Sequence, residues 1–215
     1  MRILVVLVVA SLGIPAMADL VPADVSSLPV YQAEDYSAIS LDSAAWIRGS
    51  ATAYSNLDAG PNGYVAYSSA AGVLGTDDYD SVFNSDITLT EFKFVGGVTN
   101  ADEILYFSFY EFNTLEYVDG FGVQFSQGGN YIWTITLGND VMIPDHGILQ
   151  IETDTDSGTT GQWFLGDAGP SIGTEDPMLY GTGDGSFSFN FELTGIPEPA
   201  SLALLVVGTA LIRRR

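Results

Sequence analysis

Apolar and polar residues alternate at every second position over several short segments of the chain. In residues 186–194, Phe187, Phe189, Phe191 and Leu193 are separated by small polar residues and one glutamate. This two-residue period places one face of a β-strand in a core and the other in solvent. Related patterns predict further strands at residues 64–68, 87–95, 121–126, 131–137, 148–152 and 162–165.

One segment, residues 104–112, is apolar on both faces apart from Ser108, which predicts a central strand. Glycine-containing runs predict turns between strands, among them Gly96-Gly97, Asp119-Gly120 and Gly138-Asn139-Asp140. Strands begin roughly every 8 to 17 residues, which leaves no room for the crossover connections of a parallel sheet. We therefore expect an all-β fold, an antiparallel β-sandwich or jelly roll, as one domain over residues 19–195.

The first 18 residues have the organisation of an export signal. Arg2 precedes an aliphatic run over residues 3–9, which predicts a signal helix, and Pro15 ends it. Ala16 and Ala18 form an A-x-A site, so we expect signal peptidase to cleave after Ala18. The protein is therefore predicted to be exported.

A second distinct segment covers residues 196–215. Pro197-Glu198-Pro199 precedes a short apolar helix predicted over residues 201–212, and three arginines follow it: Arg213, Arg214 and Arg215. This helix is roughly 18 Å long, whereas a bilayer core is about 30 Å thick. Three arginines after such a helix are favourable at the cytoplasmic face of a membrane. We therefore expect only transient anchoring in the inner membrane.

This tail resembles the PEP-CTERM sorting signal of Gram-negative exported proteins. The resemblance implies recognition of Pro197-Glu198-Pro199 by an exosortase, a membrane-embedded cysteine protease. It also implies removal of the tail and transfer to the cell envelope or extracellular matrix. The body is similar over residues 87–194 to a recurrent PEP-CTERM type from planctomycete-like bacteria, which brings no assigned activity. This second similarity is carried by residues 92–98, 107–110, 129–135, 160–164 and 189–192.

Charge is distributed unevenly along the chain. Of the 27 acidic residues, all except Glu198 lie in residues 19–195, but only Arg48 and Lys93 of the six basic residues do. Such a surface repels nucleic acid, which we exclude as a partner. The acidity either attracts divalent cations or reflects a salty or calcium-rich exterior that screens charge. Because the chain has no cysteine, packing rather than disulfides must stabilise the exported body.

Clustered aspartates are the candidates for a metal site. The segment that starts with Asp154 and Asp156 resembles the beginning of an EF-hand calcium-binding loop. The later ligand positions of that loop are not occupied by the required residues. Asp77-Asp78-Tyr79-Asp80 is a second cluster, and a solvated turn is the alternative for both. We predict no cofactor, with calcium at Asp154 and Asp156 as the metal to test. Paired carboxylates can also cleave glycosides, but no pair stands out.

Residues 169–173 match the G-x-S-x-G pattern around Ser171. A nucleophile elbow requires a following helix and a later histidine, whereas His146, the only histidine, comes earlier. We interpret the motif as a turn and His146 as a loop residue, and we predict no catalytic residues.

Two tryptophans, Trp133 and Trp163, lie in predicted strands, which favours the core over a sugar-binding surface. Trp46 is the better surface candidate. We expect an exported structural or adhesive protein without enzymatic activity, with exopolysaccharide as a partner class. The alternative is a carbohydrate-binding module or a weak glycan-active enzyme.

Overall fold

The computed structural model describes residues 25–33, 50–68, 72–154, 158–176 and 187–198. They form one short 3₁₀ helix, η1 (Val25–Ser27), and otherwise strands, which confirms the all-β class. The predicted signal helix and tail helix lie outside these residues, and no helix within them is long and apolar enough to span a bilayer. The strands are β1 (Val30–Ala33), β2 (Ala51–Ser55), β3 (Val65–Ser68), β4 (Val73–Asp80), β5 (Ile87–Val98), β6 (Ile104–Glu111), β7 (Tyr117–Phe125), β8 (Gly129–Ile143), β9 (His146–Thr153), β10 (Gly161–Gly166), β11 (Ser188–Phe189) and β12 (Phe191–Pro197).

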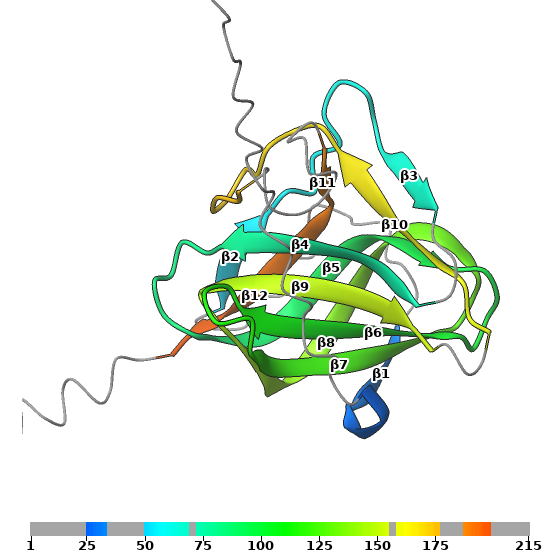
Figure 1. Ribbon diagram of the computed structural model, residues 1–215, viewed down its shortest axis with the longest axis horizontal. Helices are drawn as coiled ribbons and strands as arrows, with labels where there is room; N and C mark the ends of the chain where they lie inside the picture. The colour runs from blue at the N-terminus through cyan, green and yellow to red at the C-terminus, as the bar shows by residue number, and fades with distance from the viewer. Residues whose placement is uncertain (1–24, 34–49, 69–71, 155–157, 177–186, 199–215) are drawn as a thin grey trace, which may run out of the picture.

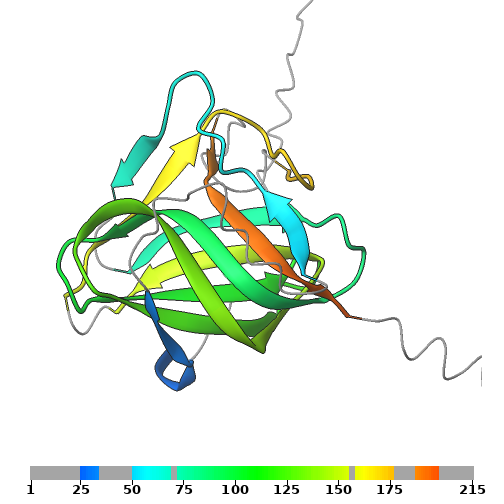
Figure 2. The same ribbon diagram turned by 180° about the vertical axis from the view of Figure 1, so that it is seen from behind.

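The strands divide into two sheets. One has the order β1-β7-β6-β9-β4; the other has the order β11-β10-β5-β12-β2, with β3 beside β10 and β8 beside β5. Figure 1 looks onto the first sheet, and Figure 2 shows β12 and β2 of the second sheet from behind. The predicted central strand is confirmed, since β6 lies between β7 and β9.

One pair of strands departs from the expected antiparallel arrangement. β1 runs parallel to β7, with Val30 opposite Gly122, whereas the other described pairs are antiparallel. The purely antiparallel prediction is therefore wrong at β1. Because β1 joins β7 from far away in the chain, no tight hairpin dictates its direction.

Aromatic side chains from both sheets form the core. Phe92 of β5 meets Phe107 of β6 at a ring-centroid distance of 4.9 Å and Phe121 of β7 at 5.6 Å, both edge to face. This geometry is favoured for aromatic pairs. The core location of Trp133 and Trp163 is confirmed, because both are fully buried. Trp46 lies outside the described residues.

Three of the predicted turns are wrong, because the strands continue through them. Gly96-Gly97 lies in β5, Asp119-Gly120 in β7, and Gly138-Asn139-Asp140 in β8, where the pairing with β5 is irregular. Glycine serves a different purpose at Gly96: a Cβ there would lie 2.2 Å from the carbonyl oxygen of Gln162. Glycine therefore lets β10 approach β5 closely.

The alternating segment 186–194 does not form a single strand. It is interrupted at the fully buried Asn190, between β11 and β12. The Asn190 N–H donates to the carbonyl of Phe164, and its own carbonyl accepts from the N–H of Val95. At this break the chain changes its pairing partner from β10 to β5, and the backbone groups of Asn190 remain hydrogen-bonded.

Candidate functional site

The predicted sorting motif begins inside β12, the last strand in the described part of the chain. β12 continues past the expected end of the body at Gly195, and Pro197 lies opposite Ile87. The Glu198 N–H donates to the carbonyl of Asp86 over 2.8 Å, and the Thr88 hydroxyl donates to the Glu198 carboxylate. The other residues predicted for export and sorting lie outside the described part of the chain: Ala16, Ala18, Pro199, Arg213, Arg214 and Arg215.

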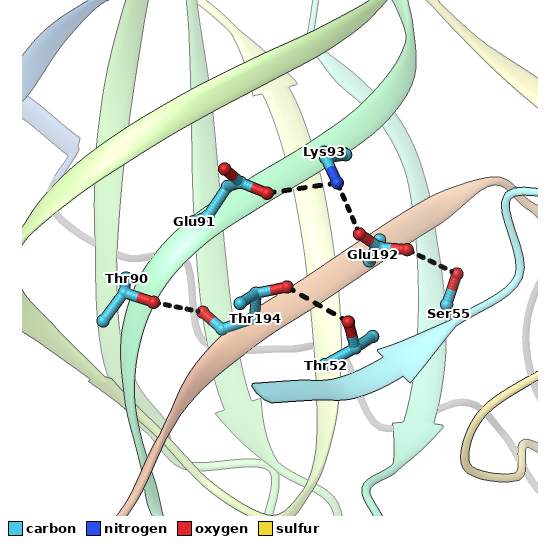
Figure 3. A network of polar contacts seen from close by, with 7 residues as sticks. All are labelled: Thr52, Ser55, Thr90, Glu91, Lys93, Glu192 and Thr194. Atoms are coloured by element: carbon cyan, nitrogen blue, oxygen red, sulfur yellow. Dashed lines mark hydrogen bonds and ion pairs between the residues drawn. The ribbon is translucent and has the colours of Figure 1, made fainter. Parts of the chain in front are cut away.

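Polar side chains fasten β12 to both of its neighbours (Figure 3). Lys93 of β5, the only lysine or arginine among the described residues, pairs with Glu192 at 2.7 Å and with Glu91 at 3.1 Å. The Ser55 hydroxyl of β2 donates to Glu192 over 2.9 Å. Thr90 donates to the Thr194 carbonyl over 3.1 Å. The strand that leads into the motif is therefore held along its length.

Two buried carboxylates occupy β4, where the sequence offered a metal-binding cluster with a solvated turn as the alternative. Asp77 and Asp78 are only 2% and 1% exposed. Asp77 accepts the N–H of Phe189 over 2.7 Å and that of Asp78 over 3.1 Å. Asp78 Oδ2 accepts the Asp176 N–H over 2.8 Å, while its Oδ1 has no hydrogen-bond partner among the described residues. The solvated-turn alternative for Asp77-Asp78-Tyr79-Asp80 is wrong, because β4 packs against the core.

A third carboxylate, Glu175, joins them from the loop that follows β10. Its Oε2 accepts the Tyr54 hydroxyl over 2.6 Å, and its Oε1 accepts the Ser188 hydroxyl over 2.5 Å. We call Asp77, Asp78 and Glu175 the acid cluster. Its hydrogen bonds join β2, β4, β11 and the loop containing Glu175, so the cluster connects segments that are distant in sequence.

Burial is the main influence on proton binding in the acid cluster. It raises the pKa of Asp77 well above its usual range, and the charge of Glu175 raises it further. Burial raises the pKa of Asp78 to about 6, although the N–H of Asp176 opposes the change. Burial, followed by the charge of Glu175, also raises the pKa of the Tyr54 hydroxyl. The carboxyl of Asp78 therefore takes up its proton at a higher pH than an exposed aspartate does.

The calcium prediction is not supported by a ligand set in the described part of the chain, where no three acidic or histidine side chains gather to hold a metal ion. Asp154 directly follows β9 and is half-buried. Asp156 lies outside the described residues. Calcium binding at these two residues stays a prediction.

A cavity of about 370 Å³ opens beside Glu175. Its lining residues include Phe187, Ser188, Glu175 and Asp167, and Phe187 is half-buried and also packs against the hydrophobic core. The volume falls within the roughly 300–1,000 Å³ typical of small-molecule sites. The wall combines an aromatic ring with hydrogen-bond acceptors, which suits a ligand rich in hydroxyl groups.

Ser171 and His146 do not assemble into a nucleophile elbow. The Ser171 N–H and hydroxyl both donate to the carbonyl of Ser55, and residues 171–176 contain no helix. The ring of His146 stacks on Phe112 at a centroid distance of 3.9 Å. His146 is the first residue of β9 rather than a loop residue, so that prediction is wrong.

Sequence reasoning did not single out Glu175, Ser188, Asp86 or Thr88. Most of their partners lie about a hundred residues away in the chain: Tyr54 is separated from Glu175 by 121 residues, and Thr88 from Glu198 by 110, whereas Ser188 is 13 residues from Glu175. A local pattern cannot reveal such pairings. The only available signal was the outward-facing position of Thr88 in its predicted strand.

No family model matches the chain, and neither the curated proteins nor the solved structures contain a significant match to it.

Proposed function

We propose that this is an exported protein of the cell envelope or extracellular matrix, sorted by an exosortase-type protease through its C-terminal tail. Its role is structural or adhesive, without catalytic activity, and its two sheets form a single β-sandwich of jelly-roll type. The observation that carries the proposal is the course of β12, which ends on Pro197 immediately before Glu198. A sorting motif at the end of β12 can be cut without removing any of the described strands.

A structural role is further supported by the acid cluster. Its hydrogen-bond partners are the side chains of Tyr54, Asn56 and Ser188 and backbone N–H groups of the protein itself. These contacts hold separate strands together, which is a function in folding rather than in substrate turnover. The aromatic core between the sheets likewise suits a protein that is stable without disulfides.

The sorting proposal predicts a defined loss of mass. In an exosortase-containing host, the mature protein should lack residues 1–18 and the residues from near Pro199 onward. Intact-mass measurement of the extracellular and envelope fractions checks this result. Substitution of Pro197-Glu198-Pro199 by three alanines should leave the tail attached, whereas Asp167→Asn, far from the motif in sequence, should not. Mature protein that retains Arg213, Arg214 and Arg215 would contradict the proposal.

A second candidate function, glycan binding, is favoured by the cavity beside Glu175. A sugar ring could stack its apolar face on Phe187 while its hydroxyls donate to the Glu175 carboxylate. The ligand class is a neutral oligosaccharide, because the strongly negative surface repels anionic chains.

Glycan binding predicts that Phe187→Ala weakens affinity for the native exopolysaccharide about fivefold, because an aromatic contact of about 1 kcal/mol is lost. Isothermal titration calorimetry on the purified protein measures this change. Tyr117→Ala removes a half-exposed aromatic ring from the other sheet and should leave affinity unchanged. Equal affinities for the wild type and Phe187→Ala would exclude this cavity as the glycan site.

A further inference from the structure

The end of β12 restricts access to the predicted sorting motif. Ile196 and Pro197 lie opposite Thr88 and Ile87 in the sheet, and Glu198 contacts Asp86 and Thr88. We propose that these contacts control when the motif can be processed: the protease can bind Pro197-Glu198-Pro199 only after the Glu198 contacts have opened. This inference rests on the proposed sorting function and adds a folding-dependent control to it.

The backbone of the motif has a single hydrogen-bond donor. Pro197 and Pro199 have no N–H, so the N–H of Glu198 is the only one in the triplet. In the folded protein it is already used by the carbonyl of Asp86, at 2.8 Å. An enzyme that binds a peptide as an added strand relies on such main-chain groups. The folded body and the protease therefore compete for the same donor.

The side chain of Glu198 is also engaged. Its carboxylate, the only charged group of the triplet, accepts the hydroxyl of Thr88, and the residue is half-buried. A protease that recognises glutamate between two prolines must read this carboxylate. Hydrogen bonds to charged groups are stronger than neutral ones. Opening the strand end therefore requires the loss of both a backbone contact and a charge-assisted contact.

The strand end is also the least supported part of β12. β2 pairs with β12 only as far as Gly195, opposite Ala51, whereas β5 continues to Pro197. Among the described strands, β12 beyond Gly195 is thus paired with β5 and not with β2. Ends of this kind open locally without unfolding the domain. The motif can therefore be released while the rest of the sheet stays intact.

Thr88→Val tests the proposal, because valine keeps the branched shape suited to a strand and removes the hydroxyl that contacts Glu198. In the purified full-length chain, we expect hydrogen exchange at the Glu198 amide to become about three to ten times faster. In an exosortase-containing host, loss of the tail after a pulse of synthesis should accelerate by a similar factor. Thr88→Ser retains the hydroxyl and should behave like the wild type.

Thr90→Val is the matched control on the same strand. It removes a threonine hydroxyl that donates to Thr194, upstream of the motif, so exchange at Glu198 and tail processing should both stay at wild-type rates. Wild-type exchange in Thr88→Val overturns the proposal, and so does faster exchange without faster processing. If neither the wild type nor Thr88→Val loses its tail in the host, the proposed sorting function is wrong. The exchange rates at the Glu198 amide then still decide whether Thr88 holds the end of β12.

Discussion

Acidification from pH 8 to pH 5 is expected to raise the melting temperature of this protein. The acid cluster places Asp77 and Asp78 in the interior, where burial raises the pKa of both carboxyl groups. A group with a raised pKa in the folded state binds its proton more tightly there than in the unfolded chain. Folding stability therefore increases as the pH falls through the folded pKa.

The pH window follows from Asp78. Its pKa is raised from 3.8 to about 6, so the stabilisation begins as the pH falls towards 6 and is complete only below 3.8. Between pH 8 and pH 5 we expect Asp78 to contribute about 1–2 kcal/mol. Asp77 acts in the same direction. Thermal unfolding followed by circular dichroism at constant ionic strength measures the effect.

Asp78→Asn separates this effect from the general repulsion among the many acidic residues. Asparagine retains an oxygen that can accept the Asp176 N–H but cannot ionise, so the variant should be about 2 kcal/mol more stable than the wild type at pH 8. Its stability should also depend less on pH. Glu116→Gln neutralises an exposed acid on the loop before β7 and should change stability by less than about 0.5 kcal/mol. An unchanged pH dependence in Asp78→Asn would show that the buried carboxylate is not responsible.

The largest loss of stability is expected for Phe92→Ala. This ring lies between the two sheets and contacts the rings of Phe94, Phe107, Phe109, Phe121 and Phe191. Its removal leaves a cavity among groups that cannot collapse together, which costs about 3–5 kcal/mol. Urea unfolding at pH 7 measures this loss of stability.

Two controls make the core prediction specific. Phe92→Leu keeps most of the apolar volume and should cost about half as much as alanine. Val82→Ala removes a side chain that is 50% exposed, so we expect a change within about 0.5 kcal/mol. A cost below 1 kcal/mol for Phe92→Ala would contradict the shared aromatic core.

These predictions concern parts of the molecule that differ in how well the sequence reveals them. The core strands were accessible because alternation is local: residues 131–137 place Trp133, Ile135 and Leu137 on one face, and all three are buried. β4 was missed because its sequence shows no alternation of apolar and polar residues. The neighbouring Asp77 and Asp78 are both buried, and the pairing of the strand is irregular near Gly75.

A pair of glycines in the sequence did not distinguish a turn from a strand. A Gly-Gly pair suits a tight turn, but it also suits a strand that another backbone approaches closely. At Gly96 the second explanation applies, and the approaching atom belongs to Gln162. Only the position of β10 distinguishes the two.

The sequence by itself determined the all-β class, most of the core strands and the resemblance of the tail to a sorting signal, because each depends on neighbours within a few positions. Only the tertiary structure decided that burial raises the pKa of Asp78 to about 6 and that Glu198 is held by Thr88 and Asp86. Both depend on contacts across about a hundred residues, with 98 separating Asp78 from Asp176. Burial and hydrogen bonding arise when distant segments pack together, and no local pattern specifies which segments these are.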